Sequence, residues 1–150
     1  EHNCAPKQMI VMVQKEVGEE MAAKSGNQTL LSLSVQVYAD IDILFTVSPS
    51  SFLPPPKVHS SVIRLMPRLH PSVKRSDLKL FFLTAKAVFF LPRKQLHNSL
   101  ALGIKIHPSE AKNLIGKADI DSSRRPGTLT IFEINRLAGI LSKDGFYGVK

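Results

Sequence analysis

The sequence predicts an α/β unit over residues 1–68 followed by a small all-α domain over residues 69–150. The first part holds short apolar runs that alternate with helical segments, whereas the second holds four helical patterns separated by prolines. The charge divides at the same place. Residues 1–68 carry six Lys/Arg and six Asp/Glu, whereas residues 69–150 carry 14 and six. The whole net charge of +8 therefore lies in the predicted helical domain, which favours a nucleic-acid partner over a merely soluble surface.

The first part reads as the closing half of an α/β sheet. "MIVMVQ" is continuously apolar, which predicts a strand buried on both faces, as in a parallel sheet. The final strands form a hairpin-like pair, so we expect the last strand to be antiparallel. The predicted order is strand (9–14), helix (15–24), helix (29–39), strand (41–47), a proline-stiffened arm, and strand (57–67).

The helices of the second part are predicted from their start signals. Ser76 can cap the first helix, and Pro92 suits the first turn of the second, "PRKQLHNSLAL". Pro108 opens the third, "PSEAKNLIGK". Thr130 with Glu133 forms a capping box for the fourth, "IFEINRLAGILS".

Composition excludes several classes of protein. Hydrophobic residues make up 43% of the chain and charged residues 21%, so we expect a packed core. No apolar run is long enough to span a bilayer, and the first residues show no signal-peptide pattern. Cys4 is the one cysteine, so no internal disulfide can form. We expect a cytoplasmic protein, or one of an organellar matrix or stroma if the source is eukaryotic.

Metal and nucleophile chemistry is not predicted. His2 and Cys4 are close together, but the other four histidines show no ligand spacing. The glycines form no G-x-G-x-x-G or P-loop, and no G-x-S-x-G is present. We therefore expect no metal site.

Two stretches remain as candidates for binding. Phe52 precedes Pro54, Pro55 and Pro56, and it reads either as a core aromatic under a loop or as a stacking platform for a flipped base, with Lys57 nearby for phosphate. The second stretch, "LPRKQLHNSL", reads either as a solvated helix face or as a phosphate-contacting patch. The residues of that patch are Arg93, Lys94, His97, Asn98 and Ser99.

Three blocks carry a resemblance to a known family. "MVQKEV" (12–17), "LSVQVYADIDILFTVSPSSFLPPPKVHSSVIRL" (33–65) and "PRKQLHNSL" (92–100) resemble the ribosomal RNA adenine N6,N6-dimethyltransferases, which methylate adjacent adenines of small-subunit rRNA. The resemblance implies the C-terminal part of a Rossmann-like S-adenosylmethionine domain (1–68) and a helical RNA-docking domain (69–150). It implies that Phe52 packs on the target base. It also implies that RNA is contacted by Lys57, Arg64, Arg93, Lys94, His97 and Asn98.

The family's donor-binding motifs are missing from this sequence. They are a glycine-rich loop, two acidic residues and a catalytic Asn-Leu-Pro-Tyr segment. We expect S-adenosylmethionine to serve the full-length family but not to bind this chain alone, which is then inactive by itself. The implied partner is small-subunit rRNA or the small ribosomal subunit, with no membrane and no metal. We also expect self-association through an open sheet edge at residues 9–14.

Two other functions stay open on the sequence. The chain could be a non-catalytic RNA-binding or ribosome-assembly module derived from the same family. A DNA-binding helical protein is the third reading, but it requires a base-reading helix, and only Arg93 and Lys94 are in position for one.

Overall fold

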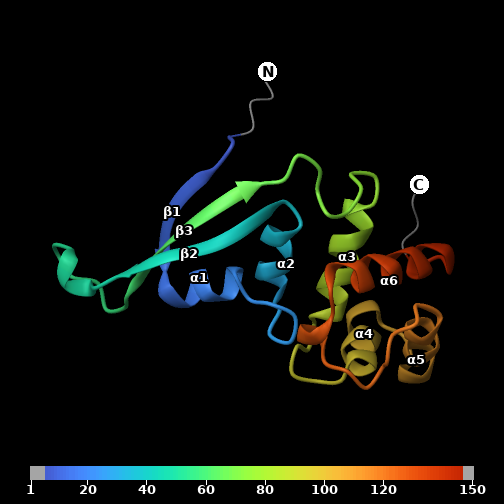
Figure 1. Ribbon diagram of the computed structural model, residues 1–150. Helices are drawn as coiled ribbons and strands as arrows, with labels where there is room; N and C mark the ends of the chain where they lie inside the picture. Colours follow the sequence, from blue (N-terminus) through green and yellow to red (C-terminus); the bar gives the residue numbers. More distant parts are fainter. Residues whose placement is uncertain (1–5, 147–150) are drawn as a thin grey trace. The chain divides into compact units, whose positions relative to one another are not determined.

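The computed structural model describes residues 6–146 and divides the chain into two compact units (Figure 1). The first unit comprises the residues up to Ala23 together with Leu31–Pro71, and the second comprises Lys24–Leu30 and the residues from Ser72 onward. The described elements are three strands and six α-helices, so the chain is a mixed α/β protein. None of the described helices is long and apolar enough to cross a membrane.

The first unit is built on a three-stranded sheet. The strands β1 (Met9–Gln14), β2 (Ala39–Val47) and β3 (Ser60–Pro67) lie in the order β1-β3-β2. β2 and β1 both pair with β3 in the antiparallel sense, which confirms the expected final antiparallel strand.

β1 corrects one prediction. It is not buried on both faces in a parallel arrangement, because Ile10 and Met12 are 50% and 53% exposed and its described neighbour is antiparallel. A continuous apolar run specifies a strand, but its burial depends on which elements pack against it.

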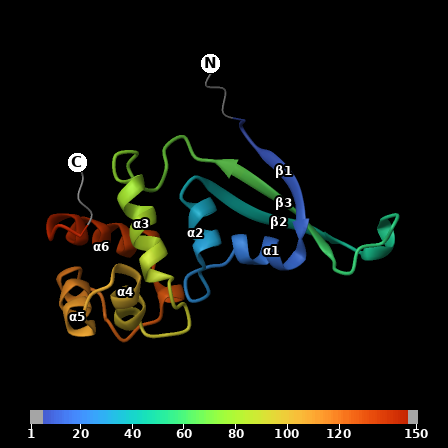
Figure 2. The same cartoon turned by 180° about the vertical axis from the view of Figure 1, so that it is seen from behind.

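Helices α1 (Lys15–Met21) and α2 (Leu30–Gln36) cover one face of this sheet (Figures 1 and 2). Met21 and Val35 from these helices pack against a buried cluster of Ala39, Ile63 and Leu65. Gly18 lies where α1 comes closest to the sheet, because a Cβ placed on it would meet the Ser61 Cβ at 3.2 Å. The glycine that weakens this helix locally is therefore explained by close helix–sheet packing.

The second unit consists of four helices. They are α3 (Leu78–Val88), α4 (Leu96–Ile104), α5 (Pro108–Lys117) and α6 (Ile131–Lys143). The α5 start at Pro108 and the capping box of Thr130 and Glu133 are as predicted.

Two predicted helix starts are wrong. Asp77, not Ser76, occupies the N-cap position of α3, and it makes no side-chain cap bond. Residues 92–94 form a turn, and α4 begins only at Leu96. Pro92 therefore lies in the turn between α3, which ends at Val88, and α4, and it does not start a helix.

Helices α3 and α4 cross very closely at Gly103. A Cβ on Gly103 would lie 2.5 Å from the carbonyl oxygen of Ala87 and 2.6 Å from its Cα. Only glycine permits this approach, since the atoms in the way are backbone atoms that cannot rotate aside.

The segment Lys24–Leu30 belongs to the helical unit although it precedes most of the sheet in sequence. The N–H groups of Gly26 and Gln28 donate to the Gly127 carbonyl at 2.9 and 3.0 Å. Gly127 lies in the 3-10 turn η2 (Pro126–Thr128), which leads into α6. These bonds attach a distant segment to the start of the last helix.

Candidate RNA interface

An exposed arm joins β2 to β3 and carries the first candidate residue. It runs from Ser48 to His59 and contains a 3-10 turn, η1 (Pro49–Ser51), which Ser48 caps through its hydroxyl. Figure 1 shows this arm projecting past the ends of β2 and β3. Residues 52–54 of the arm form bends, and residues 55 and 56 have no regular secondary structure.

Phe52 ends the 3-10 turn and is half-buried, while its neighbour Leu53 is 99% exposed. Its N–H donates to the carbonyl of Pro49 at 3.2 Å. The aromatic ring is therefore not a core residue, and the arm holds its backbone in a hydrogen-bonded turn. Lys57 lies further along the same arm, is exposed, and has no acidic partner among the described residues.

Arg64 is placed differently from Lys57. It lies on β3, and its guanidinium donates to Asp42 on the paired strand β2 at 2.7 Å. Both side chains are substantially exposed, so the pair adds little stability. Arg64 would have to release this carboxylate before it contacted a phosphate.

The turn that carries Arg93 and Lys94 is fixed by a buried serine. The Ser99 hydroxyl donates to the Val88 carbonyl at 2.6 Å and accepts from the Leu91 N–H at 2.8 Å. Ser99 is fully buried, so the expectation that it donates to a phosphate is wrong. Its role is to tie the end of α3 to α4, which holds the intervening turn in place. Arg93 and Lys94 are both exposed there.

His97 lies inside the helical unit. Its side chain is 8% exposed, and its Nδ1 lies 2.9 Å from the Ser122 carbonyl oxygen. The backbone N–H groups of Leu96 and His97 donate to the carbonyls of Arg124 and Ser122. The start of α4 is thus capped by protein carbonyls and has no free N–H groups there for a phosphate. His97 has little surface to offer RNA, and its observed contacts are structural.

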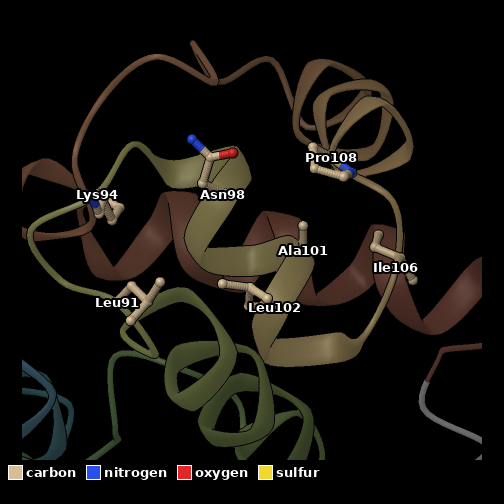
Figure 3. A pocket seen from close by; sticks show the side chains of 7 residues that line it. All are labelled: Leu91, Lys94, Asn98, Ala101, Leu102, Ile106 and Pro108. Atoms are coloured by element: carbon tan, nitrogen blue, oxygen red, sulfur yellow. The ribbon is translucent and has the colours of Figure 1, made fainter.

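Lys94 and Asn98 border a pocket of about 410 Å³ in the helical unit. In Figure 3, Leu91 and Lys94 lie on one side of Ala101. Ile106 and Pro108 lie on its other side. The remaining lining residue is Leu102. This pocket was not predicted from the sequence, although all of its lining residues lie between Leu91 and Pro108.

Arg124 and Glu133 stabilise the start of α6. The Arg124 guanidinium donates to Glu133 at 2.5 Å and to the Thr128 carbonyl at 2.7 Å. Partial burial by itself would raise the pKa of Glu133, but hydrogen bonds from Arg124 and Thr130 outweigh it and hold the pKa below its ordinary value of 4.5. Arg124 therefore has a structural role at the start of α6.

Glycine is scarce in the first unit. Gly18 is the one glycine of the first unit, and it is used for packing α1 on the sheet. A glycine-rich loop that could approach the donor closely is thus not formed by this unit. Among residues 6–146, no group of three or more His, Cys, Asp or Glu could hold a metal ion, and His2 and Cys4 lie outside the described residues.

The fold is shared with solved methyltransferases. A dimethyladenosine transferase from Plasmodium falciparum aligns with a TM-score of 0.73 at 22% identity, over 96% of this chain and 60% of that one. The 23S rRNA methyltransferase ErmE aligns with a TM-score of 0.62 at 18% identity, over 91% of this chain and 55% of its own.

Sequence comparison shows to which family of methyltransferases the chain is related. The family model of ribosomal RNA adenine dimethylase matches residues 1–141. Ribosomal RNA small subunit methyltransferase A of Clostridium acetobutylicum is 40% identical over 88% of this chain and 48% of its own length. The protein of the same name from Alkaliphilus oremlandii is 42% identical over 91% and 49%. The chain belongs to the ribosomal RNA adenine dimethylase family, and it spans about half the length of the curated relatives it matches.

Proposed function

We propose that this chain is the RNA-holding part of an enzyme that dimethylates adjacent adenines of small-subunit rRNA with S-adenosylmethionine. In this proposal the first unit is part of a Rossmann-like methyltransferase domain, and the helical unit docks on RNA. The support is membership of the family together with the two sites described above.

The exposed arm is the observation that carries the proposal. A half-buried aromatic at the end of a capped turn, with Lys57 nearby in sequence, suits a base that stacks on the ring while its phosphate contacts the ammonium. Phe52 orients the base in this arrangement and does not itself take part in methyl transfer. Lys57, Arg93, Lys94 and Asn98 supply the RNA contacts, with Arg64 contributing once it leaves Asp42.

We propose further that the isolated chain does not transfer methyl groups. Transfer requires a donor held in line with the target nitrogen, and the first unit has no glycine-rich loop to hold one. The same feature favours the second candidate, a non-catalytic RNA-binding or ribosome-assembly module. The methyltransferase part and the non-catalytic module both require that this chain binds RNA. They differ in one respect: only for the methyltransferase part does adding a donor-binding segment restore methyl transfer.

Fluorescence anisotropy with a labelled hairpin from the small-subunit rRNA 3′ end tests the role of Phe52. We expect Phe52→Ala to weaken binding by about 1–3 kcal/mol, the usual contribution of one base–aromatic stack. Leu53→Ala is the matched control, because Leu53 is on the same arm and fully solvated. Equal affinities for Phe52→Ala and wild type would remove Phe52 from the interface.

Two titrations test the wider proposal. RNA affinity should fall steeply as salt rises, because phosphate contacts release condensed counterions. Calorimetric titration with S-adenosylmethionine should give no binding. Tight donor binding by this chain would contradict its proposed dependence on a donor-holding segment.

A further inference from the structure

The pocket of the helical unit has the composition of a small-ligand site. Its walls are mostly apolar side chains, and Lys94 and Asn98 are its polar lining residues (Figure 3). Its volume of about 410 Å³ falls in the range that ligand pockets occupy, roughly 300–1,000 Å³. Ala101 contributes only a methyl group and is 3% exposed, so a small, buried side chain leaves the space open.

The polar groups of the pocket are unused by the protein. Within residues 6–146, the side-chain amide of Asn98 has no hydrogen-bond partner, and Lys94 has no acidic partner. An asparagine amide presents one donor group and one acceptor, which is the pattern that pairs with the edge of a nucleobase. The apolar walls suit the faces of a planar base.

The charge around the pocket suits the phosphates on either side of such a base. Between residues 91 and 112 the only acidic residue is Glu110. Arg93 precedes Lys94, Lys105 precedes the lining residue Ile106, and Lys112 lies one helical turn beyond Pro108 on α5. These cations are exposed and have no acidic partner in the described part of the chain.

We infer that this pocket receives an unpaired nucleobase of the bound RNA, with the Asn98 amide on the base edge and Lys94 at a neighbouring phosphate. The inference rests on the proposed function, because it assumes that the helical unit faces RNA. It gives the helical unit a preference for RNA with an extruded base over plain duplex, in addition to its general affinity for phosphate.

The experiment uses a short RNA stem with one unpaired 2-aminopurine and a fully paired stem of the same length. The full chain carries Phe52→Ala, so that stacking on the arm does not contribute. We expect about tenfold tighter binding of the bulged stem and a rise in 2-aminopurine fluorescence as the base leaves the RNA stack. Asn98→Ala should abolish this preference and the fluorescence rise.

Matched controls separate the pocket from general effects. Asn113→Ala removes the same amide from an exposed position on α5 and should keep the preference. Lys94→Gln should weaken binding of the bulged stem more than Lys143→Gln, which makes the same charge change at the end of α6. Circular dichroism confirms that each variant is folded.

The outcomes distinguish the inference from the proposed function. Salt-dependent binding of both stems with no preference, or a preference that survives Asn98→Ala, overturns the pocket alone. No binding of either stem, both with Phe52→Ala and with Phe52 intact, overturns the pocket and the proposed RNA-holding function together. A lost preference in Asn98→Ala with the controls intact supports both.

Discussion

The two units of this chain bury their apolar side chains to very different extents. Of the buried core residues, five lie in the sheet unit and 18 in the helical unit. Of the exposed large apolar residues, 11 lie in the sheet unit and four in the helical unit. The helical unit thus has a core of its own, whereas the sheet unit presents an apolar face and an edge strand to solvent.

This difference teaches that regular secondary structure and a closed core are separate properties. The strands of the sheet unit pair with β3 in antiparallel ladders, with a register shift between Ile43 and Phe45 of β2, and α1 and α2 cover one face. Its other face carries Met12, Met66 and Phe45, which are 53%, 38% and 57% exposed. The ladder pairs β1 and β2 with β3, but it leaves their outward side chains uncovered.

The largest expected effect comes from Gly103, where the helical unit is packed most tightly. Gly103→Val should destabilise the unit by about 3 kcal/mol or more, because the new side chain would overlap the backbone of Ala87. Thermal unfolding followed by circular dichroism at 222 nm measures the loss. Gly116→Ala and Gly139→Ala are matched controls, since a Cβ at either helical position meets nothing within 4 Å. These controls should be neutral or stabilise by up to about 1 kcal/mol. A Gly103→Val melt equal to that of the wild type would contradict the close crossing of α3 and α4.

The next effect is at the start of α6. Glu133→Gln should cost about 1–2 kcal/mol at pH 7, because it weakens both the capping box and the contact with Arg124. The folded-state pKa of Glu133 is lowered, so the ionised carboxylate stabilises the fold above pH 4.5. That contribution is lost as the pH falls through the folded pKa. The difference in Tm between wild type and Glu133→Gln should therefore shrink towards low pH.

Glu110→Gln is the control for this pH series. Glu110 is in the first turn of α5 and is exposed, with no ion pair in the described chain. Its substitution should change Tm much less than that of Glu133 at pH 7. A Tm difference for Glu133→Gln that stays constant from pH 7 to pH 3 would argue against the ionic cap.

A substitution on β1 should change stability least of all. It should nevertheless change self-association clearly. We predict that the chain self-associates through this edge strand, with a weight-average mass that rises with concentration in light scattering. Met12→Lys should reduce the association because it places a charge on an exposed apolar edge. Phe132→Lys makes the same change on α6, where the exposed side chain is 74% accessible, and should leave association unchanged. A monomeric mass at all concentrations would show that the chain does not self-associate through β1.

The sequence predicted those parts of the fold that depend on local chemistry. Pro108 and the pair Thr130–Glu133 placed two helix starts correctly, because a fixed φ and a reciprocal cap act within a few residues. Ser76 and Pro92 carry similar signals but gave wrong starts, because competing turns on either side of them decide where the helix begins.

The candidate site was predictable only in part. Phe52, Lys57, Arg93 and Lys94 were predicted to contact RNA, which stays a prediction, and the structure leaves the three cations exposed and Phe52 half-buried. His97 and Ser99 were assigned to RNA by their polarity, but both are buried and bonded to carbonyls from other segments. Polarity does not distinguish a side chain that binds a ligand from one that satisfies the backbone.

By itself the sequence determined that the net positive charge lies after residue 68, together with most helices and strands. These follow from apolar periodicity, proline geometry and charge, which act over short distances. The tertiary structure alone decided that β1 is exposed, that Lys24–Leu30 joins the helical unit, and that a pocket opens beside Lys94 and Asn98. The first two depend on segments far apart in the chain. The pocket depends on how the turn before α4 and the start of α5 pack around α4, which no local sequence pattern records.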